Sequence, residues 1–391
     1  MTSFLTLWLV AQAVSVVAVL IFWARTGRVP RLARVPRVAV LVAVKGRNVQ
    51  LDPFLRSLFD QDYPDYRVIF AVESQDDPAV AAIVPWRRSS EGRVTIVVGG
   101  LAIDEGQKTA NLLAAVSCLT PADEVIVLAD ADILADRNWI TQLVAPLANG
   151  EADLVSGFTW VVATDRRLAT FLLASMASAL STFPRLPFLN VAWGGSTALT
   201  RQTFEELGVA AAWRGTLSDD LQLTAIAQRA RCRIAAPPDL LPRTLGHTEG
   251  FAAVGTQARR WYMLVRVYLP ASYVLMLLGA TFAASGWIGA LAGAVSGSLF
   301  PLKAFAAALV CAALRNVGRA SVIARLWGRT GLRENLAFLL IEPLIAPVAS
   351  VANAAFAWSA LAMRRTTWAG ITYELRGPQK VRVLARRSGE G

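Results

Sequence analysis

Long stretches without a charged residue constrain this chain more than any other feature. Residues 4–23 contain no Asp, Glu, Lys or Arg, and a helix of that length crosses the hydrocarbon core of a bilayer. Arg25 and Arg28 follow directly, whereas a signal peptide carries its basic residues before the apolar run. Basic residues beside a span favour the cytoplasmic side. We therefore expect an uncleaved anchor whose C-terminal end is cytoplasmic.

Two further apolar regions lie in the last third of the chain. Between Arg266 and Arg315 the only charged residue is Lys303, which leaves room for two spanning helices with a turn near residues 296–298. Residues 335–363 form an apolar run in which Glu342 is the only charged residue, and Pro343 and Pro347 interrupt this run. This last region is compatible with a kinked span, a re-entrant hairpin or an interfacial helix.

The composition agrees with a membrane protein. Apolar residues make up 55% of the chain and the mean hydropathy is +0.45, which exceeds the usual range of soluble proteins. The net charge of +11 is concentrated after residue 23, between residues 315 and 333, and from residue 364 onward. These basic segments border apolar runs, so we expect them to face anionic lipids rather than nucleic acid. The three cysteines have no metal-ligand spacing and are expected to be reduced.

Charge and hydropathy divide the chain into three predicted regions. Residues 1–36 form an anchor and basic linker, residues 37–265 a soluble domain, and residues 266–391 a second membrane region with a basic loop and tail. In the middle region, β-branched strands alternate with helical segments, which predicts an α/β fold with a mostly parallel sheet. The predicted strands are residues 38–44, 66–72, 94–98 and 124–128, with helices at 53–59 and 108–118. Ligands of such sheets bind beyond the carboxyl ends of the strands.

Acidic residues gather where these strands end. Asp130 and Asp132 follow a buried strand, and two carboxylates in that position can hold Mg²⁺ or Mn²⁺ together with a diphosphate. Two solvated loop carboxylates would give the same pattern. Glu73 and Asp77 follow another strand and can accept hydrogen bonds from a ribose or uracil, although an acidic turn also explains them.

A third acidic cluster begins a predicted helix at residue 218. Its Ser218 or Asp219 can serve as the helix N-cap, while a carboxylate there can also act as a general base. Nearer the next apolar run, Gln257, Arg260 and Trp261 can contact a diphosphate and a sugar or lipid. A basic-aromatic belt at the membrane interface is the competing interpretation. For His247, the only histidine, both a structural role and a ligand role stay open.

The order of these clusters resembles the inverting family-2 glycosyltransferases of the GT-A fold, and most closely their ceramide glucosyltransferase branch. The matching segments are Lys45-Gly46, Asp62-Tyr63-Pro64, Asp76-Asp77-Pro78-Ala79, residues 106–112, Asp130, Gly194-Gly195-Ser196, Asp220, residues 257–261 and residues 367–373. In the last segment Ala369 stands where the family often has Arg.

The resemblance implies a Rossmann-like catalytic domain flanked by transmembrane helices. It implies that Asp220 is the catalytic base and that Gln257, Arg260 and Trp261 complete the catalytic site. The residues it places at the nucleotide sugar are Lys45, Glu73, Asp77, Lys108, Asn111 and Asp130. Asp130 and Asp132 would bind Mg²⁺ or Mn²⁺.

The expected activity is transfer of a sugar from a nucleotide sugar, UDP-linked, to the hydroxyl of a membrane lipid. A multi-pass protein of a bacterial inner membrane, with its catalytic domain in the cytoplasm, fits this activity. A processive polysaccharide synthase shares the same motifs, but two or three spans after the catalytic domain are few for a polymer channel. A non-catalytic membrane scaffold is the other alternative, and intact carboxylates in all three clusters argue against it.

Overall fold

The computed structural model describes the chain except for residues 29, 91, 184 and 387–391. Its contacts divide it into two compact units. The helical unit comprises Met1–Arg28, Trp160–Pro184 and Leu245–Met363, and the sheet unit comprises Val29–Thr159, Arg185–Thr244 and Arg364–Gly391. The units interleave along the chain, so this division differs from the three contiguous regions expected from charge and hydropathy. The amino-acid composition of residues 160–183 does not indicate that they pack with the apolar helices.

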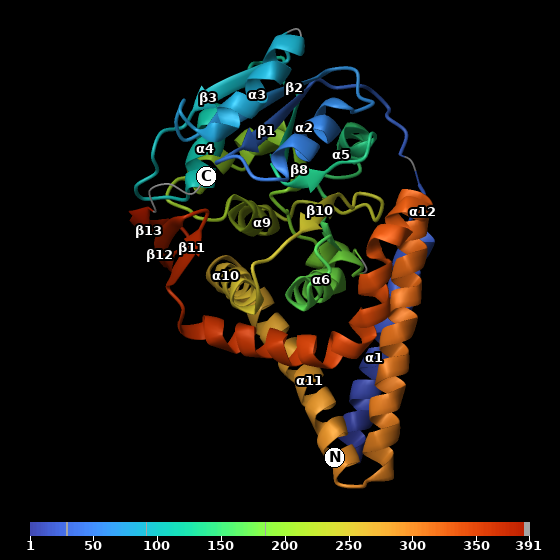
Figure 1. Cartoon of the computed structure of the whole chain (residues 1–391). Helices are drawn as coiled ribbons and strands as arrows, with labels where there is room; N and C mark the ends of the chain where they lie inside the picture. The colour runs from blue at the N-terminus through green and yellow to red at the C-terminus, as the bar shows by residue number, and fades with distance from the viewer. Residues whose placement is uncertain (29, 91, 184, 387–391) are drawn as a thin grey trace. The chain divides into compact units, whose positions relative to one another are not determined.

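The sheet unit is built on a seven-stranded sheet with the order β3-β2-β1-β4-β8-β6-β9. Its strands are β1 (Val38–Ala43), β2 (Tyr66–Val72), β3 (Val94–Val98), β4 (Val125–Asp130), β6 (Leu154–Ser156), β8 (Ser196–Thr200) and β9 (Ile234–Ala235). The first four are parallel to one another, and β8 is antiparallel to both β4 and β6. Figure 1 shows helices on both sides of these strands. The predicted α/β fold with a mostly parallel sheet is confirmed.

Alternate residues of the strands pack into two separate cores. Val38, Val40 and Val42 of β1 face one core, while Ala39 and Leu41 face the other, as the two-residue period of a strand requires. The first core is covered by α2 (Leu51–Phe59), α3 (Pro78–Ser89) and α5 (Trp139–Ala148). The second is covered by α4 (Gln107–Val116), α7 (Arg201–Glu206), α8 (Val209–Trp213) and α9 (Asp219–Arg229).

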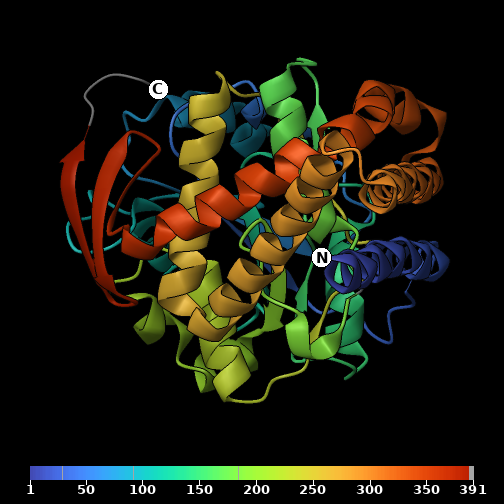
Figure 2. The same ribbon diagram turned by 90° about the horizontal axis from the view of Figure 1, so that it is seen from below.

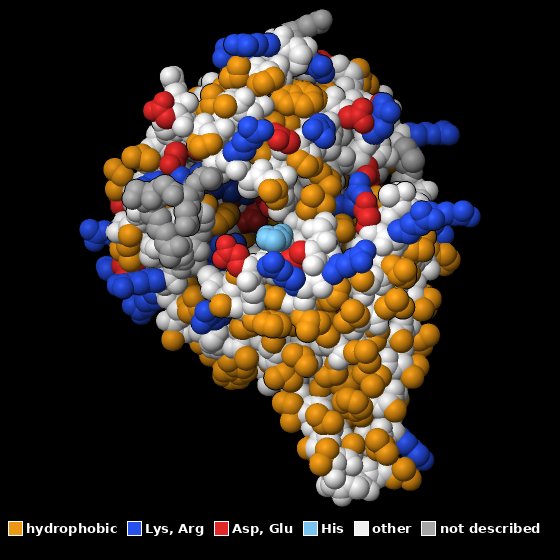
Figure 3. Space-filling view, viewed as in Figure 1, with side chains coloured by type: hydrophobic (Ala, Val, Ile, Leu, Met, Phe, Trp, Pro, Cys, Tyr) orange, Lys and Arg blue, Asp and Glu red, His pale blue; other side chains and the backbone are white. Residues whose placement is uncertain are grey.

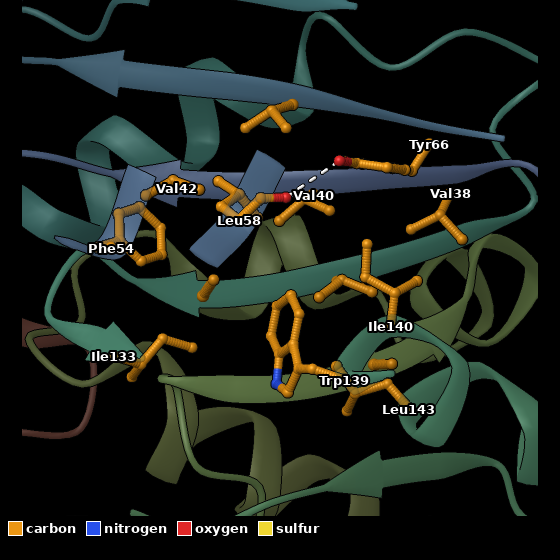
Figure 4. Packing of buried hydrophobic residues seen from close by; sticks show 14 of the residues in the cluster. Val38, Val40, Val42, Phe54, Leu58, Tyr66, Ile133, Trp139, Ile140 and Leu143 are labelled. Carbon is orange, nitrogen blue, oxygen red and sulfur yellow. Dashed lines mark hydrogen bonds between the residues drawn. The ribbon is translucent and has the colours of Figure 1, made fainter. Parts of the chain in front are cut away.

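A close view of the first core shows how helix and strand are joined. Trp139 and Leu143 of α5 belong to the same buried cluster as the valines of β1 (Figure 4). The buried Tyr66 hydroxyl of β2 donates a hydrogen bond of 3.0 Å to the carbonyl oxygen of Leu58 at the end of α2. Because strands buried on both faces need apolar residues at every position, the continuous runs in the sequence located these strands correctly.

The C-terminal residues form a second, antiparallel sheet in the sheet unit. Its strands are β11 (Arg365–Trp368), β12 (Ile371–Gly377) and β13 (Lys380–Arg386). Ala369 and Gly370 connect the first two strands, and both have positive φ angles, of 48° and 73°. Two successive residues with positive φ are typical of a tight hairpin turn that matches the twist of the strands. The tail motif at residues 367–373 is therefore this hairpin.

Within the described residues, three helices are long and apolar enough to cross a membrane. They are α1 (Thr2–Arg25), α11 (Pro270–Val295) and α12 (Leu299–Ser359), and the last two are separated by the expected turn at residues 296–298. Trp8 of α1 packs edge-on against Trp287 of α11, with ring centroids 5.0 Å apart. The outer side chains of these helices are mainly apolar (Figure 3). Water would not favour such a surface, whereas lipid chains would.

The long helix α12 changes direction. Gly328 interrupts it with a φ of 64°, and Pro343 and Pro347 lie in its second part. The end of α12 runs across the direction of α1 rather than alongside it (Figures 1 and 2). The three interpretations of residues 335–363 were a kinked span, a re-entrant hairpin and an interfacial helix, and a change of direction relative to the apolar helix α1 agrees with each of them.

The helical unit has further elements besides the three long helices. These are β7 (Trp160–Ala163), α6 (Leu168–Ser181), α10 (Phe251–Tyr268) and the short helix η2 (Ala360–Ala362). The remaining short elements of the chain are β5 (Ile133–Leu134), η1 (Pro187–Leu189) and β10 (Arg243–Gly246), which begins in the sheet unit and ends in the helical unit.

A buried ion pair ties the two parts of α12 together. Arg319 Nη1 lies 3.3 Å from Glu342 Oε1, and the side chain of each residue is only 4% exposed. Arg319 also donates a hydrogen bond of 2.9 Å to Asn316, and Ser175 of α6 donates one of 3.1 Å to Glu342. Removing one partner of such a pair leaves an uncompensated buried charge, which typically costs about 3–5 kcal/mol.

We therefore expect Arg319→Met to lower the thermal unfolding midpoint of the purified protein in detergent strongly. The double variant Arg319→Met/Glu342→Met should recover much of that loss, because neither charge remains. Arg333→Met, at an exposed position of the same helix, is the control and should leave the midpoint nearly unchanged. A single variant as stable as the parent protein would show that the pair does not hold the helix.

Candidate active site

The carboxyl ends of the parallel strands bring together segments that are distant in sequence. β1 and β4 pair along their length, with Ala43 opposite Asp130 at their ends. β2 and β3 lie on the other side of β1, so the strand order reverses direction between β1 and β4. Ligands of open α/β sheets bind outside the strands at such a reversal. Lys45, Glu73 and Asp132 follow strand ends here, and Asp130 is the last residue of β4.

Lys108 lies at the centre of a charged cluster. Its Nζ is 2.7 Å from Asp130 Oδ1 and 3.2 Å from Asp219 Oδ1. Asp130 ends β4, whereas Lys108 and Asp219 lie in the first turns of α4 and α9. These two helices cover the same face of the sheet, and Gly106 permits their close approach because a Cβ there would lie 3.0 Å from the Leu217 carbonyl oxygen.

The charged groups in this cluster shift one another's pKa values. Burial acts to lower the pKa of Lys108, but Asp130, Asp219 and Asp220 outweigh it and raise that pKa well above its usual range. Burial raises the pKa of Asp219 to about 6, against the opposing effect of Lys108. Lys108 is therefore a fixed cation surrounded by carboxylates. A negatively charged ligand that approaches Lys108 must compete with these carboxylates or be accompanied by another cation.

Gly194 leaves the space in which Lys108 and Asp219 meet. A Cβ at this position would lie 2.7 Å from Lys108 Nζ and 2.9 Å from Asp219 Oδ2. The backbone N–H of Gly194 donates a hydrogen bond of 3.2 Å to Asp220 Oδ2. The small residues just before β8 are thus required by close packing against the charged cluster.

Asp220 is held in one orientation at the N-terminus of α9. Besides Gly194, the backbone N–H of Leu221 donates to its Oδ1 at 2.7 Å, and the Ser218 hydroxyl donates to the same oxygen. Ser218 occupies the N-cap position, but its side chain does not cap the helix backbone. The Ser218 hydroxyl therefore orients Asp220 rather than capping the helix backbone, and the role of a carboxylate of this cluster as general base stays a prediction.

Asp130 and Asp132 are the two carboxylates predicted to hold a divalent cation. Burial and the neighbouring Asp130 raise the pKa of Asp132 to about 7, with Lys108 acting in the opposite direction. Two carboxylates whose charges disfavour each other form a suitable donor set for Mg²⁺ or Mn²⁺, which commonly take their other ligands from phosphate and water. Among the described residues, no group of three His, Cys, Asp or Glu side chains gathers into a metal site. The donor set thus fits a cation shared with a ligand.

Glu73 and Asp77 are both engaged by neighbouring groups. Lys45 Nζ lies 2.5 Å from Glu73 Oε1. Asp77 caps α3 by accepting a hydrogen bond of 2.9 Å from the Ala79 N–H, and it accepts another of 2.9 Å from the Gly46 N–H. Asp77 therefore joins the loop after β1 to the start of α3. Nucleotide binding by these residues remains a prediction.

Asn111 is almost fully buried, with 1% of its surface exposed. Its side-chain amide donates to the carbonyl oxygens of Ala71 and Val44, at 3.2 and 3.4 Å. Its oxygen accepts a hydrogen bond of 2.9 Å from Gln107. These bonds connect α4 to the ends of β1 and β2, so Asn111 supports the site from beneath, and its predicted contact with the donor is untested.

Gln257, Arg260 and Trp261 share one turn of α10 in the helical unit. Burial lowers the pKa of Arg260 to about 10, so the guanidinium remains charged at neutral pH. Trp261 packs against an apolar cluster that includes Leu172 and Val254. Their catalytic roles rest on the sequence motif and stay predictions.

His247 lies in the same unit as these residues. Its Nδ1 is 3.3 Å from Asp165 Oδ2, and its side chain is 55% exposed. This contact accounts for the orientation of the histidine without a metal or phosphate.

The sequence did not predict the contacts that two residues of the site make. Asp219 was considered only as a helix cap, yet it pairs with Lys108. Its adjacency to Asp220 was the available signal. Arg386, near the end of the chain, has its Nη1 3.2 Å from Glu73 Oε2. No local pattern marks it among the other basic residues of the tail.

Comparison with known proteins extends these observations. The model of glycosyl transferase family 21 matches residues 4–381. A ceramide glucosyltransferase of Komagataella phaffii is 40% identical over 47 residues, which are 12% of this chain and 9% of that enzyme. The chain therefore aligns with only a small part of this curated relative.

Two solved structures are similar to this chain at low sequence identity. A mannosyltransferase of Pyrobaculum calidifontis, solved with GDP-Man and Mn²⁺, has a TM-score of 0.50 and 20% identity, covering 83% of this chain and 99% of its own. A glucosyl-3-phosphoglycerate synthase of Mycobacterium tuberculosis, solved with Mn²⁺ and UDP-glucose, has a TM-score of 0.37 and 17% identity, covering 59% and 78%. The first agrees with the GT-A architecture of the sheet unit. Because the family model spans nearly all of the sequence, this chain belongs to glycosyl transferase family 21.

Proposed function

We propose that this glycosyltransferase moves one sugar from a UDP-sugar to a hydroxyl group of a membrane lipid, with inversion at the anomeric carbon. The observation that carries the proposal is the cluster at the strand ends, where Lys108 bridges Asp130 and Asp219 at 2.7 and 3.2 Å. Asp220 follows in the same helical turn. This arrangement supports a site in which the Lys108 ammonium group, the proposed metal ligand Asp130 and the proposed base Asp220 act together.

The donor is proposed to bind beside β1 and β2. Lys45, Glu73 and Asp77 lie in the loops after these strands and would face the nucleoside, with Asn111 beneath them. Lys108 and Asp130 would face the diphosphate. The motif at α10 suggests that Arg260 pairs with the diphosphate and that Gln257 and Trp261 complete the catalytic site.

Asp130 and Asp132 would hold Mg²⁺ or Mn²⁺. When bound, such an ion offsets the negative charge that develops on the leaving diphosphate. The Mn²⁺ in the mannosyltransferase of similar fold supports a divalent cation here.

In the proposed reaction, Asp220 accepts the proton of the lipid hydroxyl as its oxygen attacks the anomeric carbon. The bond between that carbon and the diphosphate oxygen breaks, and the nucleoside diphosphate leaves with the bonding electrons. The oriented carboxylate provides a base on the acceptor side, which a direct displacement requires. The configuration at the anomeric carbon is therefore inverted.

A lipid acceptor is supported by the apolar helices and by the matched segment of a ceramide glucosyltransferase. We propose a multi-pass protein of a bacterial plasma membrane, with the basic flanks and the sheet unit in the cytoplasm. The end of α12 would then lie along the membrane surface. A lipid headgroup at that surface can present its hydroxyl without a channel.

A transfer assay tests the proposal. Membranes that contain the protein are incubated with radiolabelled UDP-sugars, and the products are separated by organic-solvent partition and by size. We expect label in a solvent-extractable product that carries one added sugar, and at least about a hundredfold slower labelling in membranes with Asp220→Asn. Label found mainly in a long polymer would refute the lipid proposal and indicate a polysaccharide synthase.

A further inference from the structure

The last described residue of β13 reaches the proposed donor site. Arg386 Nη1 is 3.2 Å from Glu73 Oε2, and its Nη2 donates hydrogen bonds of 2.7 Å to the Ala102 carbonyl oxygen and 2.8 Å to Gln107 Oε1. One guanidinium therefore joins the end of β2, the loop between β3 and α4, and the first residue of α4. The planar group presents several donors in a fixed arrangement, which suits a junction of this kind.

The partners of Arg386 continue the connection inward. Gln107 donates to the Gly100 carbonyl oxygen at 2.8 Å and to Asn111 at 2.9 Å, and it accepts from the Ala102 N–H at 3.0 Å. Asn111 then donates to the carbonyl oxygen of Ala71 in β2. A continuous set of hydrogen bonds thus runs from the C-terminal sheet to the strand that precedes Glu73.

Other contacts hold the C-terminal sheet in the position that this junction needs. The Tyr373 hydroxyl accepts a hydrogen bond of 3.2 Å from the Gln107 N–H, and the Val383 N–H donates one of 2.9 Å to the Ile103 carbonyl oxygen. Gln379, in the turn before β13, donates to three backbone carbonyl oxygens of residues 211–214. The sheet is therefore attached on both sides of α4's N-terminus, and Arg386 is one of several anchors.

Glu73 is held between two cations. Lys45 contacts its Oε1 at 2.5 Å and Arg386 contacts its Oε2 at 3.2 Å. A carboxylate has about four acceptor positions, so both oxygens retain the capacity to accept a hydrogen bond from a ligand. With both oxygens engaged, the carboxylate cannot rotate freely. Without Arg386, Glu73 would keep only the Lys45 contact and the loop at residues 99–106 would lose one anchor.

We propose that Arg386 is a positioning residue for the donor nucleotide, through which the C-terminal sheet orders Glu73 and the loop at residues 99–106 as one wall of the nucleoside site. The inference rests on the proposed function, because it takes the ligand to be a nucleoside diphosphate. Arg386 acts through Glu73 and Gln107 and takes no part in the chemical step. Its loss should therefore weaken donor binding while the turnover rate of bound donor is retained.

The test compares Arg386→Ala and Arg386→Lys with the full-length parent protein in detergent. A charge-assisted hydrogen bond contributes enough to change affinity by about tenfold to a hundredfold. We expect Arg386→Ala to raise the Kd for UDP in the presence of Mn²⁺, and the KM for the donor, by at least about tenfold. The kcat should stay within about twofold, and Arg386→Lys should recover part of the affinity because it keeps the charge.

Arg382→Ala is the matched control, since Arg382 is an exposed arginine of the same strand. It should leave Kd and KM unchanged. Hydrogen exchange supplies a readout without ligand: residues 99–106 should exchange faster in Arg386→Ala than in the parent or the control. If Arg386→Ala does not fold, Arg386→Lys still tests the inference through the same constants.

The outcomes separate the inference from the proposed function. If the parent binds UDP and transfers sugar but the Arg386 variants have the same Kd and KM, the inference alone is overturned. A fall in kcat with unchanged KM would also overturn it, because that result indicates a general structural defect or a role in the reaction. If the parent itself neither binds UDP nor transfers sugar, the proposed function fails and the donor role of Arg386 fails with it.

Discussion

Replacing Asp220 by Asn is expected to lower the rate of sugar transfer by about 10²- to 10⁴-fold, the usual contribution of a general base. The amide cannot accept the proton of the attacking hydroxyl. It retains one oxygen to accept the hydrogen bonds that the Leu221 N–H and Ser218 now give to Asp220 Oδ1. The change in volume is small, so the turn at the start of α9 should persist.

The measurement pairs single-turnover kinetics with UDP binding on purified protein. Binding should change little, because the substitution leaves Lys108 and Asp130 in place. Glu205→Gln is a suitable control, since it makes the same chemical change at a side chain that is 60% exposed. Transfer by Asp220→Asn at a rate near that of the parent would remove Asp220 from the role of base.

Removal of divalent cations is expected to abolish transfer, and Mn²⁺ or Mg²⁺ should restore it. Without a cation, Asp130 and Asp132 would oppose the approach of a diphosphate electrostatically. Lys108 cannot neutralise that charge by itself, because it is already shared by Asp130 and Asp219. The expected effect is therefore loss of activity rather than a modest decrease.

The pH dependence of metal activation gives a second check. Burial and Asp130 raise the pKa of Asp132 to about 7 in the metal-free protein, so a cation must displace a proton from it below that pH. The Mn²⁺ concentration for half-maximal activity should consequently fall as the pH rises from about 6 to about 8. Asp132→Ala should remove most of the activation. Full activity in chelator, for the parent and for Asp132→Ala, would show that the reaction proceeds without a metal.

The sequence located the strands of the central sheet closely. The structure places β1 at Val38–Ala43 and β2 at Tyr66–Val72, against expected ranges of 38–44 and 66–72. Strands buried on both faces require unbroken apolar runs, and this requirement is local. The expected turn at residues 296–298 was also found, because the end of a long uncharged run limits where a span can stop.

The compact units and the direction of α12 depend on tertiary contacts that the sequence does not reveal. Residues 160–184 were expected in the soluble domain, but they belong to the compact unit of the apolar helices. The direction of α12 beyond Gly328 could not be chosen from sequence, since prolines and glycines are compatible with several bends. In the folded chain, α6 packs against the second part of α12, and Ser175 of α6 donates a hydrogen bond to Glu342.

The first four strands of the central sheet, and the carboxylates at or just after their ends, could be predicted from the sequence, because both depend on neighbouring residues. The contacts of Lys108 with Asp130 and Asp219, and that of Arg386 with Glu73 across 313 positions of the chain, exist only once the chain has folded. Such pairs arise when helices and strands pack, and the periodicity of a single element carries no record of its partner. The sequence gives the charge of each residue but does not indicate which group each charged side chain contacts.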